Sequence, residues 1–109
     1  MKNLEKILKV LADKNRMRII ALLEKRKMCV CELAPILGIT QPSVSRHLGK
    51  LKEIGLIEEE QDSFWTNYYL SKRDNMFVRT LLKDLANDSI VLSDRVKARN
   101  ADRKKLCKA

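Results

Sequence analysis

Apolar residues recur at helical spacing in the first part of the chain. One set has the spacing of a single helix face, and it consists of Leu4, Ile7, Leu8 and Leu11. A second segment, from Met17 to Leu23, is apolar on most sides, which is typical of a helix buried at the centre of a domain. Residues 13–15 are the expected break between the two patterns. The chain is therefore predicted to begin with two helices, the second of them in the core.

Two shorter helices joined by a tight turn are predicted next. The apolar residues of the first are spaced i, i+3, i+4 and i+7, at Val30, Leu33, Ala34 and Leu37. Gly38 follows them, and glycine is common just after the end of a helix. Thr40 can cap a further helix over residues 41–54, with Pro42 in its first turn, where a missing N–H costs little. The buried stripe of that helix would be Val44, Leu48 and Leu51.

The period of the pattern changes after these helices. Leu56–Glu60 and Phe64–Leu70 are rich in apolar, aromatic and β-branched residues, and the three residues between them suit the turn of a short β-hairpin. Helical spacing then returns close to a heptad repeat, which predicts one helix over residues 76–105. The apolar face of so long a helix needs a cover, and a homodimer interface shared with the first helix would supply it. We expect one domain over residues 1–109, mainly α with a small β-hairpin.

The net charge of +9 points to an anionic partner such as nucleic acid. Its distribution is uneven, because residues 95–109 carry six of the nine net positive charges. Such a basic C-terminal tail is either a DNA-binding arm or a solvated helix end. The first residues lack the uninterrupted apolar segment of a signal peptide, and no later segment approaches membrane-spanning length. A cytoplasmic protein without a membrane partner is therefore expected.

The helix predicted over residues 41–54 carries a polar stripe apart from its buried one. Four polar residues recur at i, i+3, i+4 and i+7, about 110° around the axis from the apolar stripe. Polar side chains near the N-terminus of such a helix suit base edges or phosphates in a major groove, although an ordinary solvent-facing stripe is the alternative. The expected DNA-binding residues are Gln41, Ser43, Ser45, Arg46, His47 and Lys50.

The chain has three cysteines, Cys29, Cys31 and Cys107. Their number and uneven spacing do not make a disulfide framework, and thiols stay reduced in the cytosol. Metal binding or redox sensing is therefore the better interpretation of these residues.

Three stretches of the chain resemble consecutive blocks of one protein family. "LADKNRMRIIALL", "CVCELAPILGITQPSVSRHLGKLKEIGLI" and "FWTNYYLS" are similar to the ArsR/SmtB family of metal-sensing bacterial repressors, over roughly residues 3–72. The resemblance implies a dimeric winged helix–turn–helix that binds an operator and releases it when a metal or metalloid occupies a cysteine site. The acidic wing sequence "EEEQDS" departs from the Arg, Lys or Gly common at such tips, so repulsion from phosphates is expected there.

The Cys29-Val30-Cys31 sequence resembles the CVC of arsenic-responsive and lead- or cadmium-responsive members. Soft thiolates select thiophilic ions, and the nearby cations at residues 25–27, together with the helix N-terminus, are expected to favour the thiolate. On a regular helix, residues i and i+2 point about 200° apart. One ion is therefore expected to unwind that turn in order to hold both sulfurs.

The identity of the ion depends on a third ligand. Many arsenic-responsive relatives have a third cysteine where Ala34 stands here, and Cys107 is the only replacement in the chain. As(III) or Sb(III) is the preferred inducer, held by Cys29, Cys31 and Cys107. Lead or cadmium sensing comes second, and thiol-redox or persulfide sensing remains an alternative. A zinc or nickel site on the last helix is disfavoured, because the pair Asp84 and Asp88 has no histidine beside it.

A protein of another class could also contain these cysteines. A cytosolic metal-buffering protein would use the cysteines but not the polar stripe of the predicted fourth helix. An enzyme is not expected, since the chain has one histidine, no Ser/His/Asp arrangement and no Gly-rich phosphate loop. No catalytic cofactor is expected either.

Overall fold

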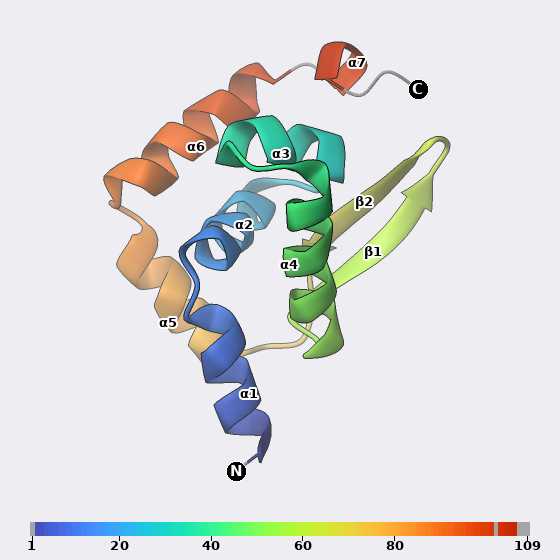
Figure 1. The fold of residues 1–109 in the computed structure, drawn as a ribbon. Helices are drawn as coiled ribbons and strands as arrows, with labels where there is room; N and C mark the ends of the chain where they lie inside the picture. Colours follow the sequence, from blue (N-terminus) through green and yellow to red (C-terminus); the bar gives the residue numbers. More distant parts are fainter. Residues whose placement is uncertain (1, 102, 107–109) are drawn as a thin grey trace.

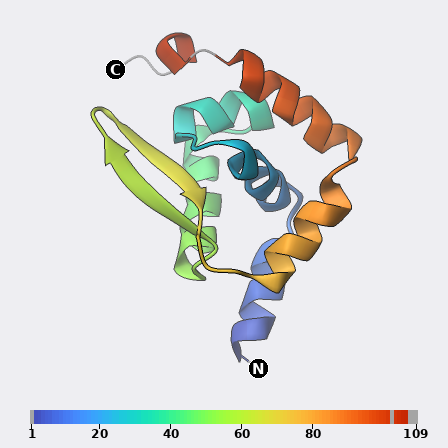
Figure 2. The same cartoon turned by 180° about the vertical axis from the view of Figure 1, so that it is seen from behind.

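The computed structural model describes residues 2–101 and 103–106, with side chains left undescribed at 2, 104 and 105. Figure 1 shows α2 at the centre, with α5 and α6 on one side and α4 and the hairpin on the other. The view from behind has the same arrangement (Figure 2). The elements are α1 Lys2–Leu11, α2 Lys14–Lys25, α3 Val30–Leu37, α4 Gln41–Glu53, β1 Ile57–Asp62, β2 Trp65–Leu70, α5 Met76–Leu85, α6 Ser89–Asn100 and α7 Arg103–Leu106.

The core surrounds α2, as the sequence pattern predicts. Ile19, Ile20 and Leu22 are fully buried, and the apolar stripes of α3 and α4 join the same core. The break before α2 is narrower than predicted, because Asp13 is the N-cap and its carboxylate accepts a hydrogen bond from the Arg16 N–H at 3.0 Å. A side-chain cap lets a new helix begin at once, so residues 14 and 15 already belong to α2.

The helix–turn–helix pair is confirmed. Gly38 ends α3 with a φ of 73°, a left-handed conformation that glycine adopts without strain. Thr40 caps α4 by accepting a hydrogen bond from the Ser43 N–H at 3.3 Å, and Pro42 lies in the first turn. These local signals fix how α4 leaves the turn.

The hairpin is confirmed, but its turn is shorter than predicted. The antiparallel register runs from Ile57 opposite Leu70 to Asp62 opposite Trp65, so the strands extend to a two-residue turn. Ser63 adopts a φ of 55° in that turn. A third segment joins the sheet, because the backbone groups of Met28 and Tyr68 exchange two hydrogen bonds of 3.1 and 2.8 Å.

The single helix predicted over residues 76–105 is wrong, because the chain bends twice and forms α5, α6 and α7 instead. Asp88 is the N-cap of α6, and its carboxylate accepts hydrogen bonds from the N–H groups of Ile90 and Val91 at 2.9 and 3.2 Å. An aspartate there starts a new helix rather than continuing the old one. Asp84 and Asp88 therefore do not share a helix face.

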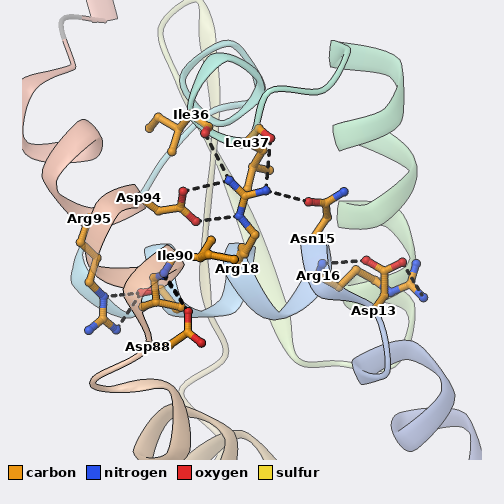
Figure 3. A network of polar contacts seen from close by, with 12 residues as sticks. Asp13, Asn15, Arg16, Arg18, Ile36, Leu37, Asp88, Ile90, Asp94 and Arg95 are labelled. Carbon is orange, nitrogen blue, oxygen red and sulfur yellow. Dashed lines mark hydrogen bonds and ion pairs between the residues drawn. The ribbon is translucent and has the colours of Figure 1, made fainter.

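A buried ion pair holds α6 against α2 (Figure 3). Arg18 donates to both carboxylate oxygens of Asp94, at 2.8 and 2.9 Å, and to the carbonyl oxygen of Leu37 at 3.2 Å. Asp94 is buried, and the two hydrogen bonds from Arg18 compensate for the loss of solvent around its carboxylate. None of the helices in the described ranges is long and apolar enough to cross a membrane.

Candidate functional site

The two neighbouring cysteines lie at the start of α3 with their sulfurs together. Cys29 is the N-cap, with an extended backbone (φ −100°, ψ 167°), and Cys31 is the second residue of the helix. Their Sγ atoms are 3.2 Å apart. The expectation that the two sulfurs point apart is wrong, because it assumed that both residues have helical backbone. No unwinding is needed to bring the pair to one ion.

The sulfur pair would fit a single thiophilic ion once Cys31, which is disulfide-bonded in this structure, is reduced. Bonds of about 2.3 Å to sulfur and bond angles of roughly 90–110° place two sulfurs roughly 3.3–3.8 Å apart, close to the separation in the structure. The third predicted ligand, Cys107, lies outside the described residues. Within residues 2–101 and 103–106, no group of three or more His, Cys, Asp or Glu side chains is arranged to hold a metal ion.

The surroundings of Cys29 favour the thiol over the thiolate. Burial is the largest cause and raises the pKa of Cys29, and the negative charge and side-chain hydrogen bond of Glu32 raise it further. A backbone hydrogen bond with Glu32 and the charge of Arg103 act in the opposite direction, but the pKa stays above its ordinary value. Two of the three cations that are expected to favour the thiolate are engaged elsewhere: Arg26 pairs with Glu32 at 2.9 Å, and Lys27 pairs with Glu60 at 2.8 Å. The predicted thiolate is therefore wrong for Cys29.

Glu32 is the buried centre of the polar contacts around this turn. Its Oε1 accepts hydrogen bonds from the Cys29 N–H at 3.1 Å and from Arg103 Nη2 at 2.8 Å, and its Oε2 faces Arg26. Burial raises the pKa of Glu32, but the hydrogen bonds from Arg103, the Cys29 amide and Arg26 outweigh it and hold the pKa below the ordinary value. The carboxylate thus links the end of α2, the start of α3 and α7.

Arg103 extends these contacts to the hairpin. It also donates a hydrogen bond to Asn67 Oδ1, and its guanidinium lies 5.0 Å from the centroid of the Trp65 ring. The basic C-terminal tail was expected to be either a DNA-binding arm or a solvated helix end. Both interpretations are wrong for two residues of this tail, because Arg103 binds Glu32 and the buried Arg95 pairs with Glu24 at 2.8 Å. No local pattern in the sequence indicates this role of Arg103, although the Cys-x-x-Glu spacing at the start of α3 is that of a capping box.

The predicted DNA-binding residues lie along α4 with unequal exposure. The exposed members are Gln41, Ser45, Arg46 and Lys50, whereas Ser43 and His47 are half-buried. His47 turns toward α2, where its Nδ1 lies 3.1 Å from Arg16 Nη1. Because an arginine can only donate, Nδ1 is the acceptor and the imidazole is neutral in this contact. The structure thus places His47 at the edge of the exposed polar face.

The acidic hairpin is partly neutralised by neighbouring cations. Lys52 of α4 pairs with Glu59, and Lys27 pairs with Glu60. These pairs tie the hairpin to α4 and to the segment before α3. Phe64 stands at the tip with 79% of its surface exposed.

Comparison with known proteins places these features in one group of regulators. The model of the family described as "Bacterial regulatory protein, arsR family" matches residues 13–59. The arsenical resistance operon repressor of Escherichia coli strain K12 is 42% identical over 66 residues, which cover 60% of this chain and 56% of that protein. The protein of the same name from Bacillus subtilis strain 168 is 37% identical over 71 residues, or 64% of this chain and 68% of that protein.

A cadmium resistance regulator is also similar. The transcriptional regulatory protein CadC of Listeria innocua is 33% identical over 63 residues, which cover 57% of this chain and 53% of that protein. The matched part of the chain thus spans little more than half the length of the E. coli and Listeria relatives.

A solved structure establishes the fold. The homodimeric winged helix–turn–helix DNA-binding domain of Mb0332 from Mycobacterium bovis superposes with a TM-score of 0.63 at 20% identity, covering 93% of this chain and 88% of that chain. The fold of this chain is a winged helix–turn–helix, in which α3 and α4 form the helix–turn–helix and the β1–β2 hairpin is the wing.

Proposed function

Because this chain belongs to the arsR family of bacterial regulatory proteins, we propose that it is a dimeric transcriptional repressor that releases operator DNA when As(III) or Sb(III) binds its cysteine sulfurs. The observation that carries the proposal is the 3.2 Å separation of the Cys29 and Cys31 sulfurs. This pair lies at the start of α3, the helix that packs against α4. Two relatives named as arsenical resistance repressors support the choice of ion.

DNA binding is assigned to the exposed face of α4. Arg46 and Lys50 are exposed cations one turn apart, and Gln41 and Ser45 add hydrogen-bonding groups toward the N-terminus. Such side chains contact base edges and phosphates when a recognition helix enters the major groove. Binding of this kind needs no catalytic group, so the protein is proposed to be a regulator and not an enzyme.

A homodimer is proposed to form through α1 and α6. Both helices leave large apolar side chains exposed: Leu4 and Leu8 on α1, and Leu92 and Val96 on α6, are 42–49% exposed. A small domain gains stability by covering such residues. A two-fold dimer would also present two copies of α4 to successive turns of the major groove.

The sulfur pair is linked to the DNA-binding elements through Glu32. The Cys29 Sγ lies 3.4 Å from Glu32 Oε1, so Cys29 loses this contact when its sulfur gives up the proton and becomes a ligand. Glu32 also holds Arg103, which contacts Asn67 and Trp65 of the wing. We propose that ligand binding loosens these contacts and shifts α3 and the wing relative to α4.

The test is a DNA-release titration. Operator DNA is first selected from a random duplex pool, and release is followed by fluorescence anisotropy with arsenite, antimonite, lead, cadmium and zinc in parallel. We expect release at the lowest concentration with arsenite or antimonite. Release by none of the ions would overturn the sensor assignment, and failure to select any DNA would overturn the repressor assignment.

Two alternative inducers are distinguished by the same titration. Lead or cadmium sensing is favoured by the similarity to CadC, and it would appear as release by those ions at lower concentration than by arsenite. Thiol-redox or persulfide sensing would appear as release by an oxidant or a polysulfide, with no ion bound. A metal-buffering protein would bind the ions but select no DNA.

A further inference from the structure

A basic pocket lies away from the DNA-binding helix. It opens between the end of α2, the first turn of α3, α6 and α7, and its volume is about 730 Å³. Among the described residues that line it, five are basic and one is acidic: Lys25, Arg26, Arg95, Arg99, Arg103 and Glu32. We propose that this basic pocket binds a small organic polyanion carrying phosphate or carboxylate groups.

The charges in the basic pocket do not cancel. Arg26 and Arg103 share the carboxylate of Glu32. Arg95 pairs with Glu24, which is not among the described residues that line the pocket. Lys25 and Arg99 form no ion pair with any residue in the described ranges. Five cations thus face two carboxylates, which leaves an excess of positive charge directed at one cavity. Clustered cations of this kind attract anions.

The basic pocket has one fixed cation and several adjustable ones. Arg95 is only 9% exposed, and its Nη2 is held by the Ala21 carbonyl oxygen at 3.1 Å and by Glu24 Oε1 at 2.8 Å. Lys25 and Arg99 are exposed at the rim. The fixed guanidinium of Arg95 gives a preorganised positive charge, whereas the exposed guanidinium of Arg99 can bind carboxylate or phosphate in two-pronged fashion.

The shape favours a small organic molecule over DNA. The volume lies within the range of roughly 300–1,000 Å³ that small-molecule sites occupy. The lining also contains the apolar side chains of Leu22 and Ala98, which suit a carbon skeleton better than a bare oxyanion. No α4 residue is among the described residues of the lining, so duplex DNA bound to α4 is not expected to occupy the pocket. Anion binding here does not need the Cys29 and Cys31 sulfurs, although Glu32 and Arg103 contribute to both places.

The test uses the full chain and isothermal titration calorimetry at constant ionic strength set with chloride. The probes are citrate, adenosine diphosphate and inorganic phosphate. We expect at least one organic probe to bind at one equivalent per chain and more tightly than phosphate. Arg99→Gln should weaken that binding about tenfold, because one charged hydrogen bond is lost.

Lys97→Gln is the matched control, since Lys97 is exposed on the same helix and carries the same charge as Arg99 but does not line the basic pocket. Equal losses in Arg99→Gln and Lys97→Gln would show a nonspecific charge effect and overturn the site. Binding of citrate and adenosine diphosphate no tighter than that of phosphate would overturn the organic ligand. Lys25→Gln, at an exposed residue on another element, guards against a folding defect in Arg99→Gln and should weaken binding in the same way.

Discussion

Arg103 Nη2 lies 2.8 Å from Glu32 Oε1, which joins the C-terminal segment to the first turn of α3. The two residues are 71 positions apart in the sequence. The same Glu32 carboxylate also accepts a hydrogen bond from the Cys29 N–H, so the turn that carries Cys29 and helix α7 depend on one another.

Arg103→Gln should lower the free energy of unfolding by about 1.5–3 kcal/mol, because Glu32 loses a charged hydrogen-bond partner while Arg26 remains. Urea denaturation measures the change. Arg99→Gln serves as the control and should leave stability nearly unaltered, since Arg99 is exposed and forms no ion pair with a described residue. An unchanged midpoint in Arg103→Gln would show that its contact with Glu32 contributes little.

Cys29→Ser and Cys31→Ser should each give a protein that binds DNA but no longer releases it with arsenite. A hydroxyl keeps the side-chain size and removes a soft ligand. Release is followed by fluorescence anisotropy. Persistence of normal release in both variants would contradict the proposed site.

Cys107→Ser tests the coordination number separately. With three sulfur ligands, X-ray absorption should show the number of As–S contacts falling from three to two, and more arsenite should be needed for release. An unaltered sulfur count and release curve would reduce the site to Cys29 and Cys31.

Arg46→Ala should weaken operator binding by about 1–3 kcal/mol if the side chain reads a base, without changing the thermal midpoint. Arg46 is exposed on α4 and apart from the buried stripe, so folding should not suffer. Arg79→Ala on α5 removes the same charge and is the control. Equal affinity of both variants for operator DNA would remove Arg46 from the interface.

Leu92→Glu should convert the dimer to a folded monomer, because the side chain is 47% exposed in the single chain and a charge there would be buried in a dimer. Analytical ultracentrifugation measures the mass, and circular dichroism checks the fold. Leu85 is half-buried at the end of α5, so Leu85→Glu tests folding as much as association. A dimeric Leu92→Glu variant would place the interface elsewhere.

Acidification should weaken the fold through His47. Burial lowers the pKa of His47, and the positive charges of Arg16, Lys50 and Arg46 lower it further, whereas Asp13 opposes the shift. The unfolded chain therefore takes up the proton first, near pH 6.5, and stability falls as the pH drops from there toward the folded-state pKa.

The slope from this one proton is at most about 1.4 kcal/mol per pH unit. His47→Gln should remove it, since an amide oxygen still accepts from Arg16 but does not titrate. The measurement is urea denaturation between pH 5 and 8, roughly the span in which histidine changes its charge. Parallel pH profiles for the two proteins would contradict this assignment.

The sequence predicted those parts of the fold that local patterns determine. The ends of α3 and α4 follow from Gly38 and Thr40, whose roles depend on their immediate neighbours. The break between α5 and α6 was also encoded locally, by Asp88, but a continuing heptad pattern obscured it.

The candidate site was predictable only in part. The two cysteines were identified, but the separation of their sulfurs depends on whether Cys29 has a cap or a helical backbone. No periodicity or residue spacing in the sequence predicts the contact between Arg103 and Glu32, because tertiary packing alone brings the two residues together. The same holds for His47, whose orientation depends on Arg16 of another helix.

The paired backbone hydrogen bonds between Met28 and Tyr68 have a mechanical consequence. Met28, the residue just before Cys29, is hydrogen-bonded to Tyr68 in the middle of β2. The wing therefore cannot tilt without displacing the backbone that leads into α3. Wing angle and the position of the turn that carries Cys29 thus behave as a single coordinate, and a hinge between them would require both hydrogen bonds to break. In amide hydrogen exchange, Met28 and Tyr68 should open together as one unit.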